Sequence, residues 1–169
     1  MTSLLPIIKD ILPIIMPSKV HVTKSTELDV ATGQTDGMVR KGAIIKKSNK
    51  VCASVMTASP HTSSAIHHHG EQDTIVYAAS GHGGTFPSYL PISHPSLRIT
   101  SLTSLPQAII SDNGQTRQEL SPGDFALIPA WTEHQEVNDG EEEVTWIITR
   151  SGSEPVVVNL KGWGEGTKD

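Results

Sequence analysis

The chain has 169 residues, a formal net charge of −5 and a hydrophobic fraction of 36%, which together fit one globular domain. The acidic balance and the lack of a run of Lys or Arg argue against a nucleic-acid partner or an anionic membrane surface. The single cysteine, Cys52, excludes an intramolecular disulfide and a cysteine-built zinc site, and it fits the cytoplasmic location that we expect.

The N-terminal segment is apolar but does not predict a membrane span. Its apolar stretch, Leu4 to Met16, is broken by Lys9, Asp10 and three prolines, and no basic side chain precedes it as in a secretory signal. We therefore expect an N-terminal arm, residues 1–19, that packs on the body or on a partner subunit. A single domain then follows over residues 20–169.

The rest of the chain predicts short strands separated by turns. Three glycines first space out residues 20–45, and Pro122-Gly123 later predicts a type II turn. Many short strands without helical periodicity indicate an all-β sandwich or barrel. The strand candidates are rich in Ile, Val and Thr: Ala43–Lys47, Val51–Thr57, Thr74–Ala79, Ala108–Ser111, Phe125–Pro129, Val144–Thr149 and Val156–Asn159.

One long segment, His82 to Pro106, interrupts this pattern. It is rich in Gly, Pro and Ser, and it contains the large apolar residues Phe86, Tyr89 and Leu90. A loop of this length is usually either a functional lid or a disordered segment, and the sequence leaves both open.

A cluster of histidines precedes that loop. Side chains alternate between the two faces of a strand, so His67 and His69 are expected on one face and His68 on the other. Neutral imidazole is the commonest metal ligand in proteins, and a shared metal ion removes the repulsion between two close imidazoles. The alternative for this cluster alone is a histidine-rich surface loop.

A second segment, Gly123 to Asn138, favours the metal site over the surface loop. Together the two segments resemble the paired motifs of the cupin superfamily, G-x5-H-x-H-x(3,4)-E-x6-G and G-x5-P-x-G-x2-H-x3-N. The chain matches them at His67, His69 and Gly81, and at Gly123, Pro129, His134 and Asn138. The resemblance covers roughly residues 43–159. It implies an RmlC-like antiparallel cupin β-barrel (a double-stranded jelly roll) with a long loop between the motifs, and a divalent metal ion on His67, His69 and His134.

The chain departs from these motifs at three positions. His61 stands at the opening glycine of the first motif, which indicates that this turn is built differently, and Trp131 replaces the middle glycine of the second. The family's acidic ligand falls on Thr74, and threonine is a poor ligand for a divalent ion.

The fourth ligand therefore stays open at the level of sequence. Gln72 ranks first, because strand alternation places it on the face of Thr74 and its amide oxygen is a possible donor. Glu136, two residues beyond His134, ranks second, and Asp73 ranks third. We keep Glu136 and His61 as candidate catalytic residues.

Three functions follow from such a site. Three histidines without a carboxylate resemble the iron sites of cupin dioxygenases that act on thiols and diketones, so we expect an Fe²⁺ dioxygenase. The alternatives are a lyase, isomerase or decarboxylase in which Zn²⁺, Mn²⁺ or Ni²⁺ acts as a Lewis acid, and a ligand-binding protein without catalysis. The expected pocket for a small-molecule substrate is lined by Thr74, Val76, Trp131 and Trp146. A homodimer is expected, through the arm and the strand at Val156.

Overall fold

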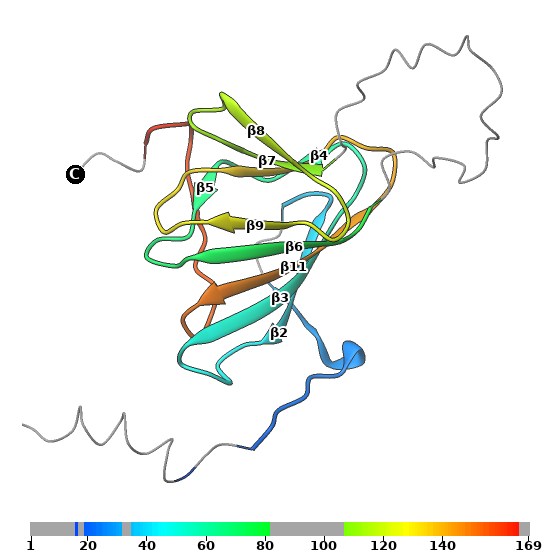
Figure 1. Cartoon of the computed structure of the whole chain (residues 1–169), viewed down its shortest axis with the longest axis vertical. Helices are drawn as coiled ribbons and strands as arrows, with labels where there is room; N and C mark the ends of the chain where they lie inside the picture. Colours follow the sequence, from blue (N-terminus) through cyan, green and yellow to red (C-terminus); the bar gives the residue numbers. More distant parts are fainter. Residues whose placement is uncertain (1–15, 17–18, 32–34, 82–106, 166–169) are drawn as a thin grey trace, which may run out of the picture.

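The protein is all-β in the part of the chain that the structure describes. The computed structural model describes Met16 and residues 19–31, 35–81 and 107–165, and within these its one helical segment is a single 3₁₀ turn, η1 (Ser25–Glu27). The strands form antiparallel sheets that fold over one interior (Figure 1). Most of the arm expected at residues 1–19 (residues 1–15 and 17–18) and the segment His82 to Pro106 lie outside the described residues.

The largest sheet has six strands in the order β1-β2-β3-β11-β6-β9. Their bounds are β1 Asp29–Val30, β2 Met38–Ile44, β3 Val51–Ala58, β6 Thr74–Ser80, β9 Phe125–Ile128 and β11 Val144–Ser151. Strand β11 comes late in the chain but lies between β3 and β6, which is a non-sequential order typical of a jelly roll.

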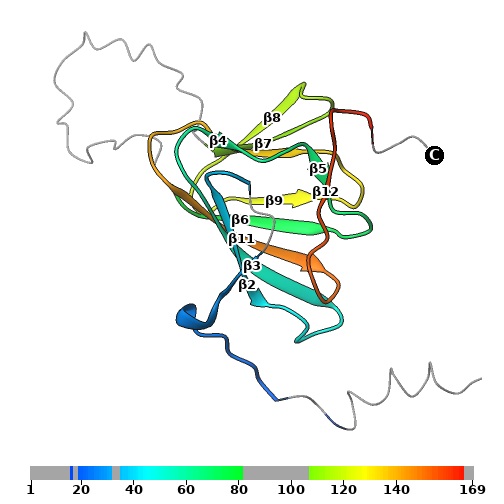
Figure 2. The same ribbon diagram turned by 180° about the vertical axis from the view of Figure 1, so that it is seen from behind.

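The opposite side of the barrel is built from a four-stranded sheet and a two-stranded ribbon (Figure 2). The sheet β4-β10-β7-β8 contains β4 Thr62–Ser63, β7 Gln107–Ser111, β8 Thr116–Leu120 and β10 Gln135–Asn138, and the ribbon pairs β5 His67–His68 with β12 Val158–Asn159. A β-bridge between His67 and His134 joins the ribbon to the sheet. The two histidine motifs are therefore hydrogen-bonded to each other through their backbones.

The core follows from the alternation of side chains along the strands. In β11, Val144, Trp146, Ile148 and Arg150 point inward and are buried, whereas Ile147 between them faces outward. The buried apolar cluster draws on most strands: Met38, Met56, Ala58, Val76, Ala78, Ile109, Leu120, Ile128, Val144, Trp146 and Ile148. These residues fill one end of the interior and hold the two sides of the barrel together.

Two glycines of the motifs occupy positions that need a glycine. Gly123 has a φ of +100° at the third position of the turn that begins at Ser121, so the type II turn predicted at Pro122-Gly123 is confirmed. Gly81 has a φ of +125°, and a side chain there would collide with Val144.

The sequence predicts most of the central strands closely and the short ones poorly. The predictions at Val51, Thr74, Ala108, Phe125 and Val144 agree with β3, β6, β7, β9 and β11 to within a few residues. The strand expected at Ala43–Lys47 is displaced, because β2 ends at Ile44, and the last strand is shorter than expected. Strands β8 and β10 were missed because their polar sequences, TRQEL and QEVN, lack an apolar run.

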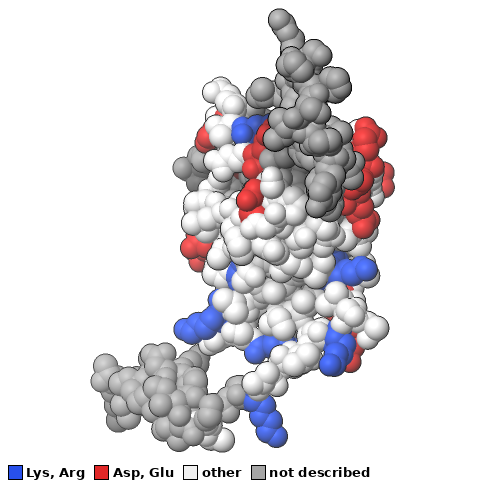
Figure 3. Space-filling model, turned by 45° about the vertical axis from the view of Figure 1, so that its right-hand side comes forward, with Lys and Arg blue, Asp and Glu red and all other residues white. Residues whose placement is uncertain are grey.

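Charge is unevenly distributed on the surface. On the face shown in Figure 3, most of the described Lys and Arg side chains lie toward the lower end, and most of the described Asp and Glu side chains lie higher. Among the described side chains of this face there is no continuous basic stripe of the kind that nucleic-acid binding needs. No helix in the described segments is long and apolar enough to cross a membrane.

Candidate metal centre

Three histidines and one glutamate converge inside the barrel. His67, His69, His134 and Glu136 are all buried, and each offers a ligand atom within 4.8 Å of those of the others. Strand β5 and the residue after it supply the first two histidines, the residue before β10 supplies His134, and β10 itself supplies Glu136. Because the backbones of His67 and His134 pair directly, the two motifs meet at this point.

The hydrogen bonds of the imidazole rings set which nitrogen is free. Nδ1 of His67 lies 2.8 Å from the carbonyl oxygen of Ala65, and Nδ1 of His134 lies 2.9 Å from that of Thr132. A carbonyl oxygen only accepts, so both Nδ1 atoms carry the proton and both Nε2 atoms keep a lone pair. Backbone partners of this kind orient metal-binding histidines in other proteins.

His69 is oriented by a side chain instead. Its Nδ1 lies 2.7 Å from Oγ1 of Thr74, and its Nε2 accepts a hydrogen bond of 2.9 Å from Nη2 of Arg150. Nε2 of His67 lies 3.2 Å from Nε2 of His69, and neither nitrogen can donate a hydrogen bond to the other because neither carries a proton. A cation is a partner that both nitrogens can share.

Glu136 supplies the fourth donor. Its Oε2 lies 3.6 Å from Nε2 of His67 and 3.7 Å from Nη2 of Arg40, and its Oε1 lies 3.8 Å from Nε2 of His134. Both carboxylate oxygens and Nε2 of His134 are buried without a hydrogen-bond partner among the described residues. Such orphaned donor atoms are costly unless something binds them, so this donor set fits a divalent ion.

The surroundings keep the cluster in the protonation states that metal binding requires. Burial lowers the pKa of His67, and burial together with Arg150 lowers the pKa of His69 to about 2. Burial alone would raise the pKa of Glu136, but His67, His134 and Arg40 outweigh it and hold this pKa well below its usual range. At neutral pH the two imidazoles are neutral and the glutamate is a carboxylate.

The placement of Gln72 corrects the expectation that it is the fourth donor. Its amide oxygen accepts a 2.7 Å hydrogen bond from the N–H of Val156, and its Nε2 donates to the carbonyls of Ser151 and Glu154. The chain turns after His69, where Gly70 has a φ of +58° and the N–H of Gln72 bonds to the carbonyl of His69. Strand alternation therefore does not extend from His69 to Gln72.

The third-ranked donor, Asp73, is also used elsewhere. Its Oδ1 accepts a 3.0 Å hydrogen bond from the N–H of Ala130, which ties the turn after β5 to the second motif. His68 points away from the cluster as expected: its Nδ1 accepts from the N–H of Gly70, and its ring lies 5.3 Å from that of Trp131.

The expected pocket residues lie in different places. Thr74 reaches the cluster only through His69, and Val76 and Trp146 belong to the apolar core, where Nε1 of Trp146 donates to Gln107 at 2.7 Å. Trp131 is exposed on the outside. None of these four residues lines the cavity described below.

His61, one of the two candidate catalytic residues, is not in the site. It is exposed, and its Nε2 lies 3.2 Å from Glu141. Its φ is +55°, and that of Trp131 is +63°. Both residues stand where the cupin motifs have glycine, and both adopt the left-handed conformation that glycine favours. The turn at His61 is therefore the glycine-type turn with a histidine in it, which corrects the expectation of a different turn.

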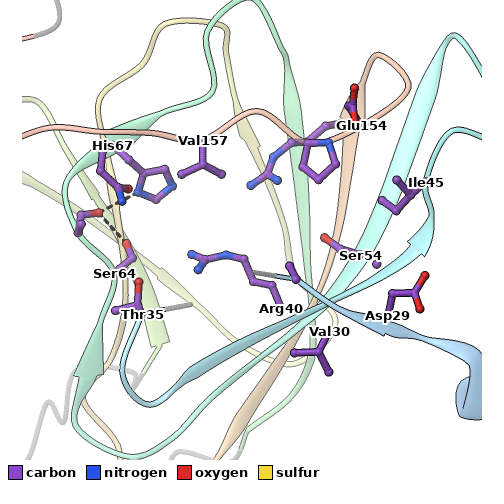
Figure 4. A pocket seen from close by; sticks show the side chains of 16 residues that line it. Asp29, Val30, Thr35, Arg40, Ile45, Ser54, Ser64, His67, Glu154 and Val157 are labelled. Carbon is purple, nitrogen blue, oxygen red and sulfur yellow. Dashed lines mark hydrogen bonds between the residues drawn. The ribbon is translucent and has the colours of Figure 1, made fainter. Parts of the chain in front are cut away.

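A cavity of about 530 Å³ opens beside the cluster, with His67 on its wall. Arg40 from β2 and Arg150 from β11 also line it. In Figure 4 the guanidinium group of Arg40 extends into the cavity toward the side of His67, whereas Asp29 and Glu154 lie toward the other end. Neither arginine is among the site residues expected from the sequence. Arg150 could have been found, because it follows Trp146 and Ile148 at every second position of the strand and therefore points inward with them.

Comparison with solved structures identifies the fold. KdgF from a Halomonas species has a TM-score of 0.53 and 19% identity over 79% of this chain and 94% of its own. The polyketide cyclase RemF from Streptomyces resistomycificus has a TM-score of 0.57 and 15% identity over 89% and 90%. An RmlC-like cupin from Shewanella frigidimarina has a TM-score of 0.52 and 12% identity over 81% and 95%.

The fold is that of the cupins. The antiparallel barrel and the His₃Glu cluster confirm the fold class and the capacity for a divalent metal ion that the two motifs imply. The sequence matches no protein-family model, and it matches no curated protein. The similarity to the solved cupins thus rests on the course of the chain and not on sequence identity.

Proposed function

We propose that this cupin is a metal-dependent enzyme that acts on a small organic molecule bound in the cavity beside His67. The observation that carries the proposal is the convergence of four buried side chains, among which both carboxylate oxygens of Glu136 and Nε2 of His134 have no hydrogen-bond partner among the described residues. His67, His69, His134 and Glu136 would hold the ion. When bound there, a divalent ion would act as a Lewis acid that polarises a carbonyl or carboxylate oxygen of the substrate.

The residues around the cluster favour an enzyme that uses the metal ion as a Lewis acid, which means a lyase, an isomerase or a decarboxylase. The expectation of a dioxygenase began from a neutral donor set, and Glu136 removes that premise because it adds a negative charge. Arg40 and Arg150 place fixed positive charge beside the position where a polarised substrate oxygen would gain negative charge. One protein with this fold is a polyketide cyclase, so the barrel is compatible with such chemistry.

An iron dioxygenase is the second candidate. Histidine and carboxylate donors around a position with free coordination sites are typical of non-haem Fe(II) oxygenases. The observation in its favour is the mixed donor set itself, which combines imidazoles with the carboxylate of Glu136.

The metal site is tested first by elemental analysis. The protein is treated with EDTA, reconstituted separately with Zn²⁺, Mn²⁺, Ni²⁺ and Fe²⁺, and desalted. We expect about one ion per chain for the wild type and for His68→Ala, and loss of stoichiometric metal in His134→Ala, because three protein donors are the usual minimum. Equal metal content in His68→Ala and His134→Ala would contradict the proposed site.

The reaction class is then decided with candidate diketones, phenolics, thiols and 2-oxo acids. Turnover by the zinc or manganese form under argon supports Lewis-acid chemistry. Turnover that requires ferrous iron and oxygen, with inhibition by zinc, supports the dioxygenase instead, because zinc has no redox chemistry. Metal without turnover of any candidate substrate in either atmosphere speaks against an enzyme of these classes.

A further inference from the structure

Arg150 is an unusual neighbour for a metal ligand. It lies near the C-terminal end of β11, and its side chain points into the barrel and is almost fully buried. Its Nη2 donates to Nε2 of His69 at 2.9 Å, and its Nε donates to Oγ1 of Thr74 at 3.3 Å. Burial lowers the pKa of Arg150 to about 10, so the guanidinium is still charged at neutral pH. A permanent positive charge therefore directly contacts one of the proposed ligands.

The contact uses the lone pair that a metal needs. Nη2 of Arg150 can only donate, so Nε2 of His69 carries the only lone pair of the neutral ring, and Nδ1 carries the proton that points toward Thr74 Oγ1. Arg150 and a metal ion compete for this lone pair. When an ion binds, Nη2 of Arg150 loses its acceptor, and a buried guanidinium N–H without an acceptor is unfavourable.

Arg40 places a second positive charge nearby. Its Nη2 lies 3.7 Å from Oε2 of Glu136, and its side chain lines the same cavity as Arg150. A divalent ion, two arginines and one glutamate bring a net charge of about +3 to this end of the cavity, by the formal charges of these groups. The acidic side chains Asp29 and Glu154 lie toward the other end, and Glu154 is 3.0 Å from Lys46.

We propose that the cavity binds a small organic oxyanion, a carboxylate or a phosphate, through Arg150 and Arg40, and that metal binding at His69 releases Arg150 to receive it. This inference rests on the proposed metal site and adds the substrate class. The anion replaces His69 as the acceptor for Nη2 of Arg150, and it offsets the positive charge beside the ion. Metal and anion then strengthen each other's binding by the same factor, because the coupling is reciprocal.

The test is calorimetric and needs no activity. Pyruvate and its neutral analogue pyruvamide are titrated into the zinc-loaded and the EDTA-treated protein, with glycerol 3-phosphate against glycerol as the phosphate arm. We expect one of the two anions to bind the zinc form at least about tenfold more tightly than the metal-free form, a coupling of ordinary size. The neutral analogues should bind far more weakly than the anions.

Two variants assign the effect to Arg150. Arg150→Gln should weaken anion binding by at least about tenfold, the usual loss for one charge-assisted hydrogen bond, and Arg150→Lys should retain part of it. Arg117→Gln is the matched control, because Arg117 lies on β8 and contacts Asp139 at 2.8 Å, away from the cavity. Circular dichroism verifies that each variant is folded, and Arg150→Lys serves alone if Arg150→Gln is not.

The outcomes separate this inference from the proposed function. Zinc binding at one ion per chain, with equal affinity for anions and neutral analogues or for wild type and Arg150→Gln, would overturn the inference and leave the metal site standing. Failure of zinc to bind would overturn the metal site and the coupling together. In that case, anion binding by the metal-free protein that depends on Arg150 would retain the anion assignment, and its absence would end it.

Discussion

The two ends of the barrel interior are built by the same strands and have opposite chemistry. Along β11 the inward side chains change from Trp146 and Ile148 to Arg150, and along β2 they change from Met38 to Arg40. The same change occurs along β3 and β6, where Ala58, Met56, Ala78 and Val76 give way to Ser54 and Thr74. Each of these four strands thus contributes to an apolar core at one end and to a charged chamber, the metal cluster with Arg40 and Arg150, at the other.

The comparison shows how a small barrel supports a costly site. Buried charges such as Glu136 and Arg150 are unfavourable unless they are paired or bound. Burial of apolar surface at the apolar end stabilises the fold. Because the same strands run through both ends, this stability also holds the polar side chains in place. Substitutions in the two ends should therefore affect different properties of the protein.

Trp146→Ala should have the largest effect, and on stability alone. Its side chain is fully buried in the apolar cluster and donates to Gln107, so we expect the free energy of unfolding to fall by about 3–5 kcal/mol. Urea unfolding measures this, with Ile147→Ala on the outward face of the same strand as the control. A similar loss in both variants would contradict the division between the inner core and the outer face.

Gln72→Ala separates structural support from metal binding. Loss of the amide leaves the N–H of Val156 and the carbonyls of Ser151 and Glu154 without their partner, and we expect a loss of about 1–3 kcal/mol in unfolding free energy. Metal content should stay near that of the wild type. Gln118→Ala, exposed on β8, is the control, and a loss of metal in Gln72→Ala would restore Gln72 as a ligand.

Acid should destabilise the metal-free protein through its polar end. Burial lowers the pKa values of His67 and His69 in the folded state, and the neighbouring imidazoles and Arg40 lower that of Glu136. The unfolded chain, with ordinary values, binds more protons below about pH 6.5, so the free energy of unfolding should fall as pH falls from there. Urea unfolding in EDTA between pH 8 and 5 measures this, and His69→Gln should show a smaller fall. Stability that is constant or rises toward pH 5 would contradict the expectation.

His61→Gly should have the smallest effect. The residue has a φ of +55°, and glycine would relieve a left-handed conformation that costs about 1–2 kcal/mol, offset by the greater entropy of glycine in the unfolded chain and by loss of the exposed contact with Glu141. We expect a melting temperature equal to or slightly above that of the wild type. Thr62→Gly, at a neighbouring residue without positive φ, should lower it.

The sequence by itself determined the barrel and the three histidines. The spacing of the two motifs and the alternation along strands are local rules, and they predict correctly that His67, His69 and His134 meet and that His68 points away. The positive φ of Gly123 follows from the same local chemistry, since a proline-glycine turn needs it.

Only the tertiary structure decided the fourth donor and the charged chamber. The turn at Gly70 breaks the alternation that would place Gln72 beside His69, and the amide is used instead by a segment more than 75 residues away in the chain. Glu136 joins the histidines because β10 pairs with the segment before β5, and Arg150 reaches His69 because β11 lies beside β6. These neighbours follow from the order of strands in the folded sheets, which no local pattern in the sequence specifies.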